Sequence, residues 1–166
     1  MPASLRPREK PAGLSHVDKS GRVRMVDVGG KAVTEREAVA RGRITVGTAA
    51  LRAIRAGKVK KGDPLQTARL AGILAAKKTS ELIPLCHPLS LTLVDVDITR
   101  ERSGYLIQSR VRTSAQTGVE MEALTAVAVA ALTIYDMLKA LDKTMTIGEI
   151  VVVEKKGGRS GHYVRA

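Results

Sequence analysis

The segment TGVEMEALTAVAVAALTIYDMLKALDK, residues 117–143, decides the fold, because it is the longest stretch whose apolar residues recur at helical spacing. One stripe of such residues faces a core; it consists of Leu124, Val127, Ala131, Ile134, Leu138 and Leu141. The opposite stripe is small and apolar in its middle and charged toward its ends, where Glu122 and Asp136 lie. We therefore expect a helix buried on both sides. Its back would be covered by another element or, as we favour, by a second copy of the chain.

The charged residues of this helix allow both structural and chemical roles. Thr117 followed by Glu120 is a capping-box pattern, so Glu120 either caps the helix or belongs to a site. Asp136 and Lys139 have the three-residue spacing of a surface ion pair or of an acid–base pair. At a helical rise of 1.5 Å per residue, Glu122 and Asp136 lie about 21 Å apart along the axis. They cannot both touch one small reacting centre within a single chain.

Length and composition indicate a single domain with a sizeable core. A chain of 166 residues can bury such a core without disulfides or metal. The only cysteine, Cys86, excludes an internal disulfide and suits a reducing compartment. Neither a long uninterrupted apolar run nor a signal-peptide pattern is present, so we expect a soluble, cytoplasmic protein with no membrane partner.

The formal net charge of +12 indicates an anionic partner or substrate. Nucleic acid is one candidate. The chain has no Phe or Trp and only three Tyr, which leaves few side chains for bases to stack on. A phosphorylated small molecule fits the charge equally well.

The remaining pattern predicts an α+β fold. Residues 1–13 contain three prolines and three basic residues, and we expect a flexible basic arm before a domain at 14–166. The pattern after the arm predicts a short helix at 34–40 capped by Thr34, a strand at 43–46, a helix at 48–56, a helix from Pro64 to about Ser80, a hairpin of strands at 91–99 and 104–113, and a last strand at 149–154. This order fits a ferredoxin-like antiparallel sheet with helices packed on one face.

Several short features could carry chemistry, although each has an ordinary structural explanation. His87 lies beside Pro88 in a stiff loop and follows Cys86, but adjacent residues rarely act together as nucleophile and base. Lys60 and Lys61 fit a solvated turn. The three histidines and the cysteine have no paired metal-ligand spacing, so we expect no metal site.

Two long segments taken together carry a specific resemblance. KKGDPLQTARLAGILAAKKTSELIPLCHPL, residues 60–89, and the segment at 117–143 resemble the cyclic pyranopterin monophosphate synthase family of molybdenum cofactor biosynthesis. The resemblance extends from about Met25 to Gly161. It implies a lyase that converts (8S)-3',8-cyclo-7,8-dihydroguanosine 5'-triphosphate, made from GTP by a radical SAM cyclase, to cyclic pyranopterin monophosphate with release of pyrophosphate.

The resemblance also implies roles for particular residues. The catalytic residues that it implies are Asp136, Lys61 and Lys139. The substrate-binding residues that it implies are Leu85, Cys86, His87, Met121 and Glu122, with Glu120, Arg36, Lys156 and Arg159 as further candidates for the same pocket. A lysine among other cations loses its proton more readily, which would suit Lys139 or Lys61 as a general base.

The family is a homohexamer, a trimer of dimers, and the separation of Glu122 from Asp136 favours sites shared between subunits. No cofactor is implied, although Mg²⁺ could arrive with the triphosphate. The chain departs from the family pattern at Leu138, where a cysteine is frequent, and at Gly29 and Gly30, where a serine–alanine pair is frequent. Two other functions stay open: a non-catalytic nucleotide-sensing oligomer and, less favoured, a nucleic-acid-binding domain.

Overall fold

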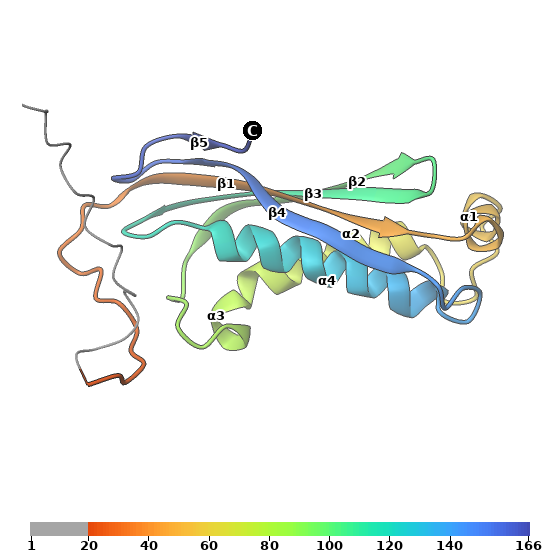
Figure 1. Cartoon of the computed structure of the whole chain (residues 1–166), viewed down its shortest axis with the longest axis horizontal. Coiled ribbons are helices and arrows are strands. Elements are labelled where there is room, and N and C mark those ends of the chain that lie inside the picture. The colour runs from red at the N-terminus through yellow and green to blue at the C-terminus, as the bar shows by residue number, and fades with distance from the viewer. Residues whose placement is uncertain (1–19) are drawn as a thin grey trace, which may run out of the picture.

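The computed structural model describes residues 20–166, whose strands form one antiparallel five-stranded sheet with helices on one face (Figure 1). The elements are, in chain order, β1 (Thr34–Thr45), α1 (Thr48–Arg55), α2 (Pro64–Lys77), α3 (Thr79–Leu82), β2 (Leu91–Glu101), β3 (Gly104–Ala115), α4 (Glu120–Leu138), β4 (Thr146–Lys156) and β5 (Tyr163–Val164). The strand order is β2-β3-β1-β4-β5, which confirms the predicted ferredoxin-like α+β fold. The predicted arm, residues 1–13, lies outside the described residues.

β1 occupies the centre of the sheet, and it shows that our prediction of a helix at 34–40 is wrong. β1 pairs antiparallel with β3 on one edge and with β4 on the other. Ala38 and Ala40 are almost completely buried within it. Pairing on both edges and burial under the helices outweigh a local helical preference, which amounts to a few tenths of a kcal/mol per residue.

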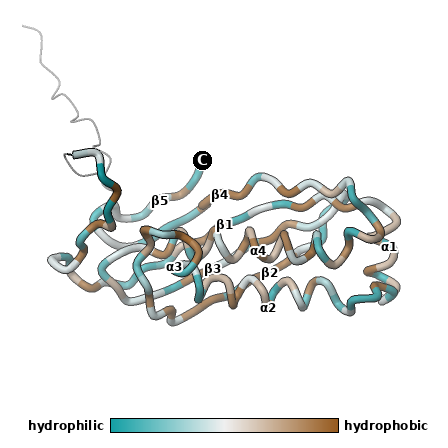
Figure 2. The backbone as a smooth tube through the Cα atoms, turned by 90° about the horizontal axis from the view of Figure 1, so that it is seen from below, coloured by the Kyte–Doolittle hydropathy of each residue, from teal (hydrophilic) through white to brown (hydrophobic). Residues whose placement is uncertain are grey.

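α4 and α2 lie side by side on the same face of the sheet, with α4 against β1, β3 and β4 and α2 against β2 (Figures 1 and 2). A Cβ placed on Gly42 of β1 would come within 2.7 Å of Val127 Cγ1, so α4 packs closely on the central strand. On the other side of α4, a Cβ on Gly72 of α2 would come within 2.8 Å of the carbonyl oxygen of Ala126. α2 and α4 are therefore closely packed at Gly72. Over this part of α4 the cover is α2 of the same chain, so our preference for a second copy is wrong there.

Among residues 20–166, α4 is the one helix long and apolar enough to cross a membrane by length and composition alone. Its middle is buried: Ala123, Val127, Ala130 and Ile134 have no exposed surface. This placement, against the sheet and beside α2, is that of a core helix.

The predicted ends of α1 and the start of α2 are confirmed, and residues next to these boundaries explain them. α1 is followed by Gly57 with a φ of +64°, and α2 begins at Pro64 with the Asp63 side chain accepting from the backbone N–H groups of Leu65 and Gln66. The predicted hairpin is present, and in its first strand the Val96 and Ile98 side chains are buried while Asp95 and Asp97 are exposed.

Other boundaries differ from the prediction. α4 begins at Glu120 with no side-chain cap, so the capping box of Thr117 and Glu120 is wrong; the Glu120 carboxylate binds Lys155 instead. α4 ends at Leu138, several residues before Lys143. The last long strand extends beyond 149–154 at both ends, and the two-residue strand β5 adds to its edge.

Candidate active site

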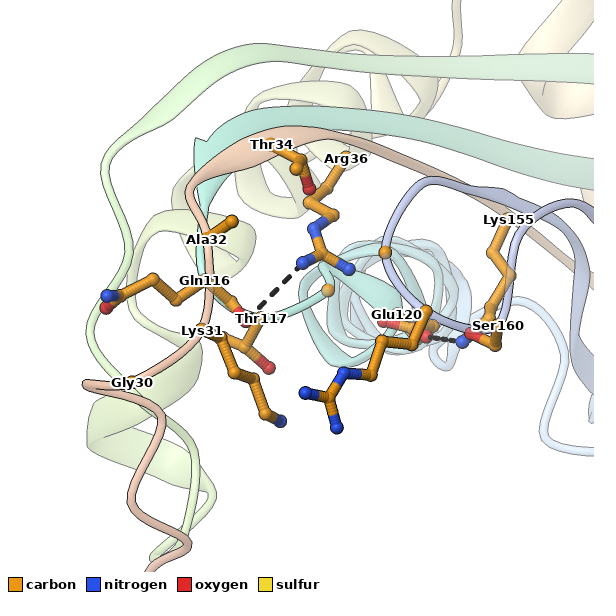
Figure 3. A pocket seen from close by; sticks show the side chains of 13 residues that line it. Gly30, Lys31, Ala32, Thr34, Arg36, Gln116, Thr117, Glu120, Lys155 and Ser160 are labelled. Atoms are coloured by element: carbon orange, nitrogen blue, oxygen red, sulfur yellow. Dashed lines mark hydrogen bonds and ion pairs between the residues drawn. The ribbon is translucent and has the colours of Figure 1, made fainter.

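The N-terminal end of α4 borders a hollow of about 630 Å³ that carries four cationic side chains and one carboxylate. The cations are Lys31, Arg36, Lys155 and Arg159, and the carboxylate belongs to Glu120. They come from the segment before β1, from β1, from β4, from the loop after β4 and from the first turn of α4. In Figure 3 the head groups of Lys31 and Arg36 point toward the same space beside Glu120. Such an excess of positive charge suits a polyanion, and phosphates in particular.

Glu120 and Lys155 connect the helix to the sheet at this hollow. Lys155 Nζ donates to Glu120 Oε1 at 2.6 Å, and both side chains are about 30% exposed. A Cβ on Gly118 would come within 2.1 Å of Glu120 Oε2, so the glycine leaves room for the carboxylate to fold back toward the turn before α4. Glu120 therefore orients Lys155 and lowers the net positive charge of the hollow by one.

A second hollow, of about 400 Å³, adjoins the first and shares Lys31, Thr117, Gly118 and Glu120 with it. It brings together five of the residues that the sequence predicted for substrate contact: Leu85, Cys86, His87, Met121 and Glu122. The loop before β2 and the first turn of α4, more than thirty residues apart in the chain, meet here. The two hollows form a cationic part and an adjoining, less polar part of one candidate site.

Glu122 is the buried acid of this site. Only 4% of the residue is exposed, and burial raises the pKa of its carboxyl, with a further upward contribution from Glu120. A carboxyl group with a raised pKa can hold a proton and donate it to a ligand. Glu122 is therefore the residue of this hollow best suited to act as a general acid.

Cys86 and His87 occupy the wall of the second hollow and are not arranged as a nucleophile and its base. Burial, followed by the charge of Glu122, raises the pKa of the Cys86 thiol, which disfavours the reactive thiolate. The Nε2 atom of His87 lies 2.8 Å from the carbonyl oxygen of Val26, which implies an N–H at that position. His87 thus holds the segment before β1 over the hollow.

A third group of charged residues lies at the C-terminal end of α4. Lys61 Nζ lies 2.6 Å from Asp136 Oδ2, and Lys139 Nζ lies 2.7 Å from Asp136 Oδ1. The hydrogen bonds from Lys139 and Lys61 lower the pKa of Asp136 to about 2, and the hydrogen bond to Asp136 raises the pKa of Lys139. The raised pKa of Lys139 runs against the expectation that it loses its proton easily. Lys139 is a cation here, and Asp136 is a carboxylate.

The two ends of α4 stay apart. Glu122 and Asp136 belong to the same straight run of α4, so the separation of about 21 Å along the axis applies. Figure 1 shows the segment before β1 near the start of α4 and α1 near its end. Within one chain, the hollow and the Lys61–Asp136–Lys139 cluster are therefore two separate parts.

The structure places Lys156 away from the hollow. Lys156 Nζ lies 3.3 Å from Glu37 Oε1 and 2.9 Å from Glu154 Oε1, on the sheet face opposite the helices. Lys155, which the sequence prediction did not include, faces the hollow instead. Consecutive strand residues point to opposite faces, and extending the predicted strand to residue 156 would have separated these two lysines. Lys31 was also missed, because the sequence around Gly29 and Gly30 has no periodicity that would place it.

The described residues include no group of three or more His, Cys, Asp and Glu side chains that could hold a metal ion. The fold and the site together define a ferredoxin-like α+β protein whose cationic hollow has the size and charge for an anionic small molecule.

Comparison with known proteins identifies the particular family. The sequence model of the MoaC family matches residues 25–158. The cyclic pyranopterin monophosphate synthase of Heliobacterium modesticaldum is 60% identical over 154 residues, which cover 92% of this chain and 97% of that protein. Proteins of the same name from Pelotomaculum thermopropionicum and Thermomicrobium roseum are 58% and 59% identical over 156 residues, covering 93% of this chain and 92% and 94% of theirs. The chain belongs to the MoaC family.

Proposed function

We propose that this protein is a lyase that converts (8S)-3',8-cyclo-7,8-dihydroguanosine 5'-triphosphate to cyclic pyranopterin monophosphate and pyrophosphate. The observation that carries the proposal is the hollow with Lys31, Arg36, Lys155 and Arg159, in a chain about 60% identical to proteins named cyclic pyranopterin monophosphate synthase. A triphosphate is the kind of ligand for which four convergent cations are suited.

The geometry supports a division of labour between the two hollows. The cationic hollow holds the phosphates and stabilises the charge on the departing pyrophosphate. The ring system then lies in the adjoining hollow, where Glu122, whose carboxyl pKa is raised by burial, can donate a proton during ring opening and closure. Formation of the cyclic phosphate joins a hydroxyl oxygen of the substrate to the innermost phosphorus, releases pyrophosphate and transfers the hydroxyl proton to a base.

Asp136, Lys61 and Lys139 supply the second catalytic group in this proposal. The ionised Asp136 carboxylate holds the ammonium groups of Lys61 and Lys139, whose positive charges can pair with the reacting phosphate. Because this cluster lies about 21 Å along α4 from Glu122, we propose that it completes the site of another subunit. A homohexamer built as a trimer of dimers provides such shared sites. The exposed Leu70, Leu74 and Leu132 on the helix layer supply apolar surface for association.

The setting of the reaction belongs to the same proposal. A radical SAM cyclase acting on GTP supplies the substrate, and the protein works in the cytoplasm without nucleic acid or a membrane. The protein needs no cofactor of its own, and Mg²⁺ arrives with the triphosphate, whose oxygen atoms it prefers as ligands.

The direct test supplies the purified protein with the cyclised dihydro-GTP intermediate and follows both pyrophosphate release and the pterin product. Wild-type turnover that is lost in Asp136→Asn and in Arg36→Ala supports the reaction and both parts of the site. Recovery of bound substrate unchanged would favour the non-catalytic nucleotide-sensing alternative, which the names of the relatives do not favour.

A further inference from the structure

The loop after β4 contains two consecutive glycines in a backbone conformation that other residues rarely adopt. Gly157 has a φ of +95° and Gly158 a φ of +75°. The N–H of Gly161 donates to the carbonyl oxygen of Gly158 at 3.1 Å and closes a four-residue turn. This turn carries Arg159 and Ser160, which line the cationic hollow. A positive φ is a sufficient reason for glycine at these two positions. The contacts of the turn with its neighbours give a second reason.

The turn lies directly on Arg36 of β1. A Cβ on Gly157 would come within 2.2 Å of the carbonyl oxygen of Glu35 and 3.1 Å of Arg36 Cδ. A Cβ on Gly158 would come within 1.6 Å of Arg36 Nη1 and 2.7 Å of Cζ. Among residues 20–166, the three atoms nearest to this Cβ all belong to the guanidinium group of Arg36. The space that a side chain would take at this position is therefore the space occupied by the guanidinium group.

The opposite side of Arg36 is held by the chain that follows β3. Its Nε donates to the carbonyl oxygen of Ala115 at 3.4 Å, and its Nη2 to that of Gln116 at 3.5 Å. Figure 3 shows the guanidinium between these residues and Glu120, pointing into the hollow. Within residues 20–166, Nη1 has no hydrogen-bond acceptor in the protein. The fork of Arg36 thus has one edge engaged by carbonyl groups and Nη1 left for a ligand.

We propose that Gly157 and Gly158 are positioning residues, whose bare backbone clamps the Arg36 guanidinium so that Nη1 meets a phosphoryl oxygen in the hollow. The proposal rests on the proposed function in taking that phosphate to be the substrate's. Long, weak hydrogen bonds to two carbonyl groups do not fix a flexible side chain by themselves. The close approach of Gly157 and Gly158 to Arg36 restricts the guanidinium further, and an anion then meets a group that is already oriented.

A matched pair of alanine variants tests this clamp. Gly161 belongs to the same turn and has a φ of +62°, but a Cβ there meets nothing within 4 Å. Gly158→Ala and Gly161→Ala therefore introduce similar backbone strain, and only the first displaces the guanidinium. The probe is inorganic triphosphate, with its Kd measured by titration calorimetry. We expect Gly158→Ala to raise the Kd about tenfold or more, the scale of a lost charge-assisted hydrogen bond, and Gly161→Ala to change it by less than about threefold.

A double variant separates a clamp from a general distortion of the loop. In an Arg36→Ala background, Gly158→Ala has no guanidinium to displace, so its further effect on the Kd should be less than about twofold. If Gly158→Ala alone fails to fold, Arg36→Ala/Gly158→Ala should fold as Gly161→Ala does, because the clash is gone. Equal effects of Gly158→Ala with and without Arg36 would overturn the inference.

Turnover distinguishes this inference from the proposed function. Wild-type protein that binds triphosphate but does not form the pterin product contradicts the proposed function and leaves the clamp intact. If turnover is established, Gly158→Ala should raise KM with little change in kcat, since the clamp orients a binding group. Wild-type protein that turns over substrate while Gly158→Ala matches Gly161→Ala in Kd and KM contradicts the clamp alone.

Discussion

Lys61 holds Asp136 at two points: its Nζ donates to Oδ2 at 2.6 Å and to the backbone carbonyl oxygen of Asp136 at 3.0 Å. Lys61 comes from the turn before α2, so the contact ties that turn to the last turns of α4. A cation beside the C-terminal carbonyl groups of a helix is also favoured by the helix dipole. The position of the Asp136 carboxylate is thus set by two lysines and by the end of the helix that carries it.

Asp136→Asn should abolish most of the activity and leave the fold intact. The amide carries no charge to hold Lys61 and Lys139 in place, and we expect kcat to fall about 10²–10³-fold. Melting temperature should change little, because the ion pairs of Asp136 are exposed and such pairs contribute little to stability. Because Lys139 and Lys61 lower its pKa to about 2, Asp136 stays ionised down to that pH, and the acid side of a pH–rate profile should not report it.

The matched control for this variant is Glu149→Gln. Glu149 also loses an exposed ion pair, with Arg43, but it belongs to neither part of the candidate site. Activity should remain at the wild-type level. An Asp136→Asn protein with wild-type kcat would remove Asp136 from the mechanism.

Sites shared between subunits predict complementation in mixed oligomers. Lys61 and Asp136 touch within one chain, so variants at these two residues would damage the same half of the site and should not complement. Asp136→Asn damages the cluster at the C-terminal end of α4, whereas Arg36→Ala damages the hollow at its N-terminal end. When their chains are mixed randomly, about a quarter of the sites should combine an intact hollow with an intact cluster, and activity should recover to that level. Mixtures that stay as inactive as either parent would place the whole site in one chain.

Glu122→Gln should make the protein more stable at neutral pH. Burial raises the pKa of the Glu122 carboxyl. Its stabilising contribution to the free energy of unfolding is therefore fully present below the ordinary pKa of 4.5, and it is lost as the pH rises through the raised pKa. The amide carries no charge to bury, and the melting temperature should rise by about 2–4 °C for each kcal/mol of burial cost relieved. Thermal unfolding at several pH values measures this, and the difference in melting temperature between the variant and the wild type should vanish below pH 4.5.

Glu120→Gln is the matched control for this pH series. Glu120 lies two residues away on the same helix, but its carboxylate is paired with Lys155. Its replacement should leave the melting temperature unchanged or lower it. A Glu122→Gln protein that is no more stable than the wild type at neutral pH would show that the buried carboxyl is compensated.

The sequence predicts the fold where spacing and caps act locally, and fails where pairing is long-range. α2 could be placed from Asp63 and Pro64, and the hairpin from the alternation of Val96 and Ile98 with charged residues. β1 could not, because its burial comes from β3 and β4, whose partner residues lie about 60 to 120 positions later in the chain. A short segment rich in alanine and glutamate gives a helical pattern until those neighbours are known.

The candidate site divides in the same way. The resemblance named the residues of the second hollow and the Asp136 cluster, and the structure brings each group together. It did not identify Lys31, and it named Lys156 where the structure has Lys155 at the hollow. These placements depend on how the loop before β1 and the last residues of β4 lie against α4. Whether the grouped residues act in catalysis stays a prediction that the variants above address.

Gly72→Ala tests how closely α2 and α4 pack. The new Cβ would lie 2.8 Å from the carbonyl oxygen of Ala126 and 3.4 Å from Ala130 Cβ, and a backbone oxygen cannot move away without bending α4. Overpacking of this kind costs roughly 1–3 kcal/mol, against about 1 kcal/mol gained from the better helix propensity of alanine. We expect a net loss of stability, measured as a lower midpoint in urea. Gly148→Ala is the matched control, because a Cβ at this strand glycine meets nothing within 4 Å, and its midpoint should be unchanged or slightly higher. A Gly72→Ala protein at least as stable as the wild type would mean that the two helices can separate at little cost.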